Sequence, residues 1–159
     1  VRPDVMTLAK GLGGGIPVGA LVVGERAQGT LVAGDHGSTF GGNLLAMSAA
    51  CVVLKRMKNS AFLGHVEAVG AYLEEGLRTL ASDFPSLAGE VKGRGLLRGL
   101  KVTVPPADIV DACRRKGVLI ASAGSDVLRF VPPLTVSYTS CDILFKKLRE
   151  IFTGLVNTL

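Results

Sequence analysis

The sequence has 159 residues, 48% of them hydrophobic and 19% charged, which is the composition of a globular chain with a core and excludes a disordered one. Its net charge of +5 comes from scattered lysines and arginines with only 5% aromatic residues, which does not favour a nucleic-acid partner. The sequence has no CxxC pair and no metal-spaced histidines, so metal-binding motifs are excluded. It has no apolar run long enough to span a bilayer, and together these features favour a cytoplasmic protein.

The first part of the chain is predicted to come from an α/β sheet. An apolar run over 4–9 ends at Lys10, and a glycine-rich loop then leads into a strand over 18–24 that we expect to be buried. A loop of turn-forming residues over 34–43 precedes a helix over 44–58, which is apolar almost all round and is therefore expected to be buried. Because the chain opens without methionine inside a predicted strand, we expect a fragment of a longer protein.

The second part of the chain is predicted to be an α+β domain, because helical and strand patterns alternate along it. The three cysteines fall in apolar helical patterns and are expected to be small core residues. The predicted elements are a helix from Ser60, a half-buried strand over 90–104, a helix over 106–116, strands over 118–121 and 127–131, and a helix from Thr139.

Lys10 is the first candidate for a functional residue, because it ends a predicted buried strand and precedes the small residues GLGGG. A lysine amine kept from water loses its charge and can condense with a carbonyl compound such as pyridoxal phosphate. The glycines would let a flat ring approach the backbone. On the residues alone, a solvated loop lysine is the more common case. A nucleotide-binding P-loop is excluded, because there the lysine follows the glycines.

Two other places carry polar side chains suited to anions. Arg129 lies within the apolar run VLRFV, where its guanidinium either binds a carboxylate through two parallel bonds or points to solvent from the polar face of a strand. Ser38 and Thr39, in GSTFGG, offer hydroxyl and backbone donors to a phosphate, or else they cap the loop. His65 is expected on a helix surface, and Arg98 is expected to be structural or solvent-facing.

Four segments resemble the class III, ornithine-type aminotransferases, and they occur in the order of that family. They cover nearly the whole chain, so that together they are more specific than any one motif. The segments are PDVMTLAKGLGGGIPVGA at 3–20, GDHGSTFGGNLLA at 34–46, GRGLL at 93–97 and VLRFVPPL at 127–134.

The resemblance implies a fold, a reaction and a partner. The fold would be α/β, with 1–58 as the end of the large domain of a fold-type I pyridoxal-phosphate enzyme and 59–159 as its small C-terminal α+β domain. The sequences GDHGSTFGGN and VLRFVPPL resemble those of enzymes that move the amino group of N-acetylornithine to 2-oxoglutarate in arginine biosynthesis. Ornithine, succinylornithine and 4-aminobutyrate remain alternative amino donors. The family implies a homodimer with its active site at the subunit interface.

The resemblance also implies roles for individual residues. Lys10 would hold pyridoxal phosphate as a Schiff base and move the proton at the substrate Cα. Thr39, with Ser38 as a weaker candidate, would bind the cofactor phosphate of the other subunit, and Arg129 would bind the substrate α-carboxylate. Leu44 stands where the family usually has proline. The alternative is a non-catalytic oligomerising module, because the family's phosphate loop, stacking aromatic and pyridine-binding aspartate do not occur in this sequence.

Overall fold

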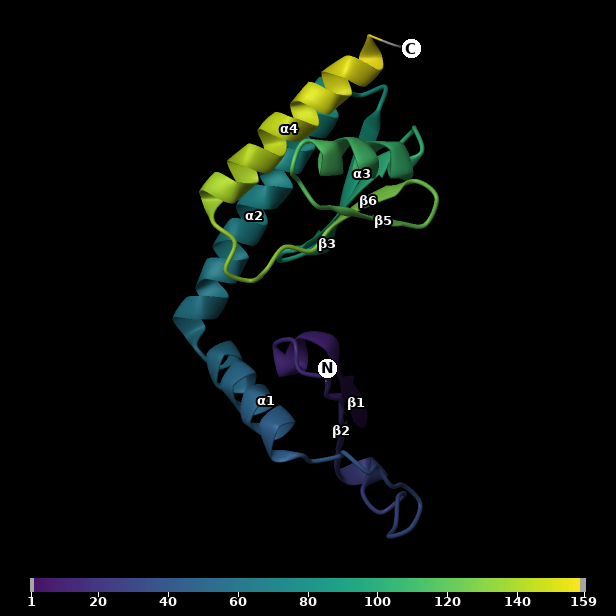
Figure 1. Ribbon diagram of the computed structural model, residues 1–159, viewed down its shortest axis with the longest axis vertical. Helices are drawn as coiled ribbons and strands as arrows, with labels where there is room; N and C mark the ends of the chain where they lie inside the picture. The colour runs from purple at the N-terminus through teal and green to yellow at the C-terminus, as the bar shows by residue number, and fades with distance from the viewer. Residues whose placement is uncertain (1, 158–159) are drawn as a thin grey trace. The chain divides into compact units, whose positions relative to one another are not determined.

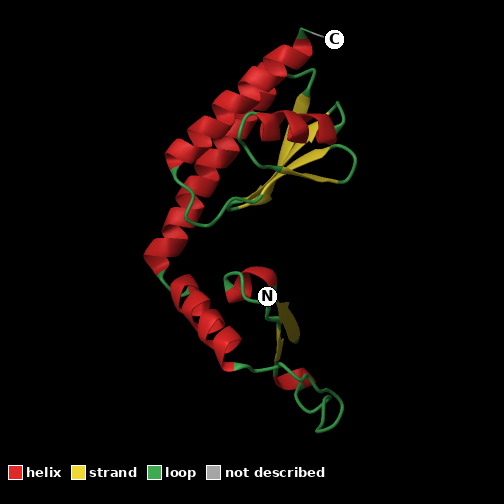
Figure 2. Cartoon of the chain, in the orientation of Figure 1, coloured by secondary structure: helices red, strands yellow, loops and turns green. Residues whose placement is uncertain are grey.

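The computed structural model describes residues 2–157, and the chain forms two compact units, Val1–Phe62 (unit 1) and Leu63–Leu159 (unit 2). Figure 1 labels the elements and Figure 2 shows which segments are helix, strand and loop. In chain order they are β1 (Val5–Leu8), η1 (Lys10–Gly13), β2 (Ala20–Val23), η2 (Glu25–Ala27), α1 (Leu44–Met57), α2 (Ser60–Asp83), β3 (Ala88–Arg94), β4 (Leu97–Val102), α3 (Pro106–Arg115), β5 (Ala121–Ala123), β6 (Val127–Phe130) and α4 (Tyr138–Val156).

Unit 1 contains a two-stranded antiparallel sheet and the helix α1. β1 and β2 pair in the register Val5↔Val23, and the short 3-10 helix η1 that follows β1 packs against α1. α1 begins where the sequence predicts it, because the side chain of Asn43 accepts a hydrogen bond from the amide of Ala46 at 2.9 Å. Lys10 is therefore the first residue of a short helix that packs against α1.

The burial predicted for two segments of unit 1 is wrong for this chain. Every residue of β2 is exposed, and on α1 the buried residues are Ala46 and Ala50. Leu44 and Val52 of the same helix are 85% and 70% exposed. Their apolar character was read correctly, but none of the residues described in this chain covers them.

Unit 2 contains a four-stranded antiparallel sheet in the order β3-β4-β6-β5. The single strand predicted over 90–104 is in fact the hairpin of β3 and β4. The reason lies in Gly93 and Gly95, whose φ angles of 113° and 55° let the chain reverse between the strands. The strand predicted over 118–121 is displaced to β5.

The core of unit 2 lies between this sheet and its helices. α2 and α4 pack against each other through the edge-to-face rings of Tyr72 and Tyr138, and α3 contacts α4, β5 and β6 (Figure 1). Alternation along β4 and β6 sends apolar side chains into the core and leaves the other face of the sheet open. The fully buried core residues include Val69, Leu73, Leu77, Leu87, Leu100, Ile109, Leu128, Leu148 and Phe152.

Candidate active site

Lys10 has an unusual backbone conformation. Its φ is +56°, and it is the one non-glycine residue among those described, 2–157, with a positive φ. The left-handed region costs a residue with a Cβ free energy, and such strained residues concentrate at functional sites. The strain thus marks Lys10 as a position where the surrounding structure dictates the backbone.

The strain is imposed by the tight turn at the end of β1. Ala9 is fully extended, and its carbonyl accepts a hydrogen bond from the Leu12 amide at 3.2 Å, so the chain turns sharply at Lys10. Leu12 is buried, and a Cβ added to Gly14 would lie 3.4 Å from the Val53 side chain of α1. Turn and helix are therefore closely packed, which holds Lys10 in place.

The Lys10 side chain is exposed in this chain, contrary to the burial that its chemistry led us to expect. Among the described residues it makes no hydrogen bond or ion pair, and none joins it to Ser38 or Thr39. The amine is thus without a polar partner among the described residues, and none of these residues keeps water from it.

The loop before α1 is built from consecutive turns. The Gly41 amide donates to the Ser38 carbonyl at 3.2 Å, and the Asn43 amide donates to the Phe40 carbonyl at 3.3 Å. A Cβ on Gly41 would lie 2.9 Å from that of Ser38, so the turn requires glycine there. Within residues 2–157 the hydroxyls of Ser38 and Thr39 make no hydrogen bond, and both residues are exposed. The loop-capping alternative for these hydroxyls is thus not what the structure has.

Arg129 lies on the open face of the unit 2 sheet, between the buried residues Leu128 and Phe130. Its neighbours on the adjacent strands are both small, Gly99 on β4 and Ala121 on β5. The guanidinium is exposed and has no ion-pair partner in the described part of the chain. Because Gly99 and Ala121 have small side chains or none, there is space beside the Arg129 guanidinium for a planar carboxylate.

Two lysines on the same sheet have acidic partners. Lys101 pairs with Asp126 at 3.5 Å, and Lys92 pairs with Glu90 at 3.0 Å. Arg129 differs from these lysines, because no acidic side chain of the described residues pairs with it.

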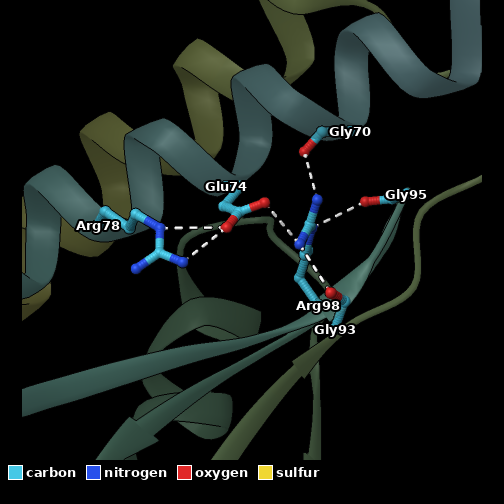
Figure 3. Close-up of polar contacts among 6 residues, drawn as sticks. All are labelled: Gly70, Glu74, Arg78, Gly93, Gly95 and Arg98. Atoms are coloured by element: carbon cyan, nitrogen blue, oxygen red, sulfur yellow. Dashed lines mark hydrogen bonds and ion pairs between the residues drawn. The ribbon is translucent and has the colours of Figure 1, made fainter.

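Of the two roles expected for Arg98, structural or solvent-facing, the structure has the structural one. Its side chain is 8% exposed, and its guanidinium donates to the carbonyls of Gly95, Gly93 and Gly70 and pairs with Glu74 (Figure 3). Strand alternation places this side chain on the helix-facing side, where an apolar residue would be expected. The sequence signal that was available is this break in the apolar pattern of β4.

Two smaller predictions need correction. His65 is half-buried rather than on the helix surface, and its Nε2 lies 3.1 Å from the Val136 carbonyl oxygen, which ties α2 to the segment after β6. Cys113 and Cys141 are buried as expected, but Cys51 is exposed on α1. In the described residues no group of three or more acidic, histidine or cysteine side chains could hold a metal ion, and no helix could cross a membrane.

Residues 1–152 match the family described as aminotransferase class III. The chain belongs to the class III aminotransferases. The acetylornithine aminotransferase of Listeria innocua is 42% identical over 149 residues, which are 94% of this chain and 38% of the relative. That of Gloeobacter violaceus is 43% identical over 156 residues, which are 98% of this chain and 39% of the relative.

Solved structures of ornithine and N-acetylornithine aminotransferases have the same α/β fold. Ornithine delta-aminotransferase of Plasmodium falciparum matches with a TM-score of 0.90 and 28% identity over all of this chain and 42% of its own. N-acetylornithine aminotransferase of Stenotrophomonas maltophilia matches with a TM-score of 0.86 and 32% identity, over the same shares. The chain therefore spans about two-fifths of the length of the proteins it resembles.

Proposed function

We propose that this chain is part of a pyridoxal-phosphate-dependent aminotransferase that moves the amino group of N-acetylornithine to 2-oxoglutarate, as a step of arginine biosynthesis. The relatives that are 42% and 43% identical are named for acetylornithine, whereas the ornithine aminotransferase is 28% identical, which supports N-acetylornithine over ornithine as the amino donor. The observation that carries the proposal is the strained, left-handed backbone of Lys10 in a turn packed on α1. A chain without a use for this amine would gain by having glycine there.

Lys10 would bind the cofactor through its Nζ. When bound, pyridoxal phosphate supplies an electron sink that stabilises negative charge at the substrate Cα. The amine, once free of the cofactor, would take the proton from the substrate Cα and deliver it to the C4′ atom of the cofactor. Its lack of any partner in residues 2–157 supports this role, because no contact within the described chain must be broken first.

Ser38 and Thr39 would bind the phosphate of the cofactor. The chemistry of these donors fits, since both residues are exposed and neither hydroxyl makes a hydrogen bond within residues 2–157. We assign the phosphate to the second copy of the chain, with Thr39 as the main donor.

Arg129 would hold the α-carboxylate of each substrate in turn. A guanidinium without an acidic partner, on the open face of a sheet beside Gly99 and Ala121, suits a bidentate bond to a carboxylate. Both N-acetylornithine and 2-oxoglutarate carry such a group, so one residue can serve both half-reactions.

We propose that the enzyme is a homodimer, and the exposed apolar residues of unit 1 support a protein partner. Leu44, Leu45 and Val52 on α1 and Phe40 before it are between 70% and 85% exposed. These residues also favour the second candidate function, an oligomerising module without catalysis. A monomeric mass at micromolar concentration would count against both.

The reaction can be tested in a chimera. This chain would replace its matched segment in the Gloeobacter violaceus relative, and the product would be assayed with N-acetylornithine, ornithine and 2-oxoglutarate. We expect transamination of N-acetylornithine, with a bound-cofactor absorption band that Lys10→Ala removes. Activity retained by Lys10→Ala would contradict the role of Lys10, and a preference for ornithine would contradict the proposed donor. A chimera that binds the cofactor but transaminates nothing would favour the non-catalytic module.

A further inference from the structure

The guanidinium of Arg98 closes the turn between β3 and β4. Its Nε donates to the Gly95 carbonyl at 2.8 Å, and one terminal nitrogen donates to the Gly93 carbonyl at 2.9 Å (Figure 3). These carbonyls flank the tip of the hairpin and come from residues with positive φ. One side chain thus ties both sides of the turn together.

The same guanidinium fastens the turn to α2. Its other terminal nitrogen donates to the Gly70 carbonyl at 3.3 Å. The terminal nitrogen that donates to Gly93 also forms an ion pair of 2.7 Å with Glu74, one helical turn farther along α2. Arg78 holds Glu74 from the exposed side through two hydrogen bonds of 2.7 and 3.1 Å. Arg78 and then Arg98 lower the pKa of the Glu74 carboxyl, which keeps it ionised opposite the buried cation.

Helix and turn meet without side chains between them. A Cβ on Gly70 would lie 2.6–2.9 Å from backbone atoms of Gly95, closer than real Cβ atoms approach. The hairpin can therefore approach α2 in this way only with glycine at position 70, and Arg98 supplies the directional bonds that hold it there. We call this set, Gly70, Glu74, Gly93, Gly95 and Arg98, the hairpin clamp.

The hairpin clamp lies next to Arg129 in the sheet. Gly99, which follows Arg98, pairs with Arg129, and Arg98 itself pairs with Phe130, so that the two arginines occupy adjacent steps of the β4–β6 ladder on opposite faces. A shift of β4 along α2 would displace Gly99, the residue of β4 that lies beside Arg129. The position of the Arg129 guanidinium thus depends on where the clamp holds β4.

We propose that Arg98 is a positioning residue for carboxylate binding by Arg129, an inference that rests on the function proposed above. An apolar residue at position 98 would pack into the core without the cost of burying a charge, but it would not fix the hairpin in one place. A lysine would keep the charge but lose the planar fork that reaches several acceptors at once.

The first test uses the chain as it stands. Hydrogen exchange of backbone amides would be compared between the wild type, Arg98→Met and the control Arg78→Met, which removes the exposed partner of the same Glu74. We expect amides of β4 and β6 around Arg129 to exchange about tenfold faster in Arg98→Met and to stay near wild type in Arg78→Met. Unchanged exchange around Arg129 in Arg98→Met would overturn the proposal.

The second test measures substrate affinity in the Gloeobacter chimera. Arg98→Met, Arg98→Lys and Gly70→Ala are each expected to raise the KM for 2-oxoglutarate about tenfold, with kcat changed about twofold or less, because the carboxylate is held less well throughout the reaction. Gly70→Ala leaves Arg98 in place, so it disturbs the clamp independently. Leu148→Ala, which opens a cavity in the core of unit 2 on α4, is the control for general loss of stability.

The outcomes distinguish a failure of the proposed function from a failure of the positioning role of Arg98. An inactive wild-type chimera, or a normal KM in Arg129→Met, overturns the proposed function and this inference with it. An active chimera in which Arg129→Met raises KM, but Arg98→Met raises it no more than Leu148→Ala does, overturns the positioning role alone. A larger effect of Arg98→Met and Gly70→Ala than of Leu148→Ala supports it.

Discussion

Gly70 on α2 and Gly95 in the β3–β4 turn touch backbone to backbone, since a Cβ on Gly70 would lie 2.6 Å from the carbonyl carbon of Gly95. This contact sets the depth at which the hairpin lies on the helix. Figure 3 shows the carbonyl groups of both glycines directed at the Arg98 guanidinium, which donates a hydrogen bond to each. Packing and hydrogen bonding therefore fix the same point of unit 2.

Gly70→Ala should destabilise unit 2. The added methyl group meets backbone atoms that cannot rotate away, and overpacking of this kind costs about 1–3 kcal/mol. Gly64→Ala is the matched control, because it lies on the same helix with nothing within 4 Å of its Cβ, and alanine there should stabilise the helix by roughly 0.5–1 kcal/mol. Urea unfolding followed by circular dichroism measures both, and equal effects of the two substitutions would contradict the contact.

The sequence predicted the helices of unit 2 better than its sheet. The apolar stripe of α2 and the glycine after α3 are local signals, so these helices were placed to within a few residues. The β3–β4 hairpin was read as one strand, because alternation runs through Leu100 and Val102 and does not by itself reveal a turn. Gly93 and Gly95 carried the signal of a reversal. The burial of Arg98 depends on its ion pair with Glu74, which lies on α2, and the spacing of residues in the sequence does not reveal such a pair.

One thiol per chain should react rapidly at pH 8. Burial raises the pKa of the Cys113 thiol to about 11, and burial also raises the pKa of Cys141. Cys113 is therefore almost fully protonated at pH 8, the thiolate of Cys141 is disfavoured in the same direction, and both side chains are buried, whereas Cys51 is exposed. A disulfide reagent should label a single thiol in the native chain and three after unfolding. Cys51→Ser should remove the fast reaction, and fast labelling that survives this substitution would show that the core opens.

The charge of Glu74 should make a pH-dependent contribution to stability. Its folded pKa is depressed, first by the hydrogen bond from Arg78 and further by Arg98, so the contribution is present above the unfolded value of about 4.3 and is lost as pH falls through the folded value. Glu74→Gln should therefore lower the urea midpoint clearly at pH 7 and much less near pH 3. Glu67→Gln, on the exposed side of α2 and without a hydrogen bond or ion pair in residues 2–157, should change it little at either pH. A constant difference for Glu74→Gln across this range would contradict the ion pair.

The candidate site shows where a single sequence stops being informative. Lys10, Ser38, Thr39 and Arg129 were all chosen from local patterns, and the structure leaves each of them exposed and without a polar side-chain partner in the described chain. What the patterns could not supply is burial. Whether Lys10 is desolvated depends on which residues cover it. The spacing of apolar residues in the sequence shows only that one face of an element is apolar, and it does not show what packs against that face.

The backbone of Lys10 offers the most direct test of whether the turn stores strain for the sake of the amine. Lys10→Gly and Lys10→Ala both remove the amine, but glycine adopts a φ of +56° without strain, whereas alanine retains the Cβ that is disfavoured there. Lys10→Gly should therefore be more stable than Lys10→Ala by about 1 kcal/mol. The amide of Leu12, which donates to the Ala9 carbonyl across the turn, reports this as slower hydrogen exchange in the glycine variant. Equal exchange in the two variants would mean that the turn tolerates a side chain at no cost, and the strain argument for Lys10 would fail.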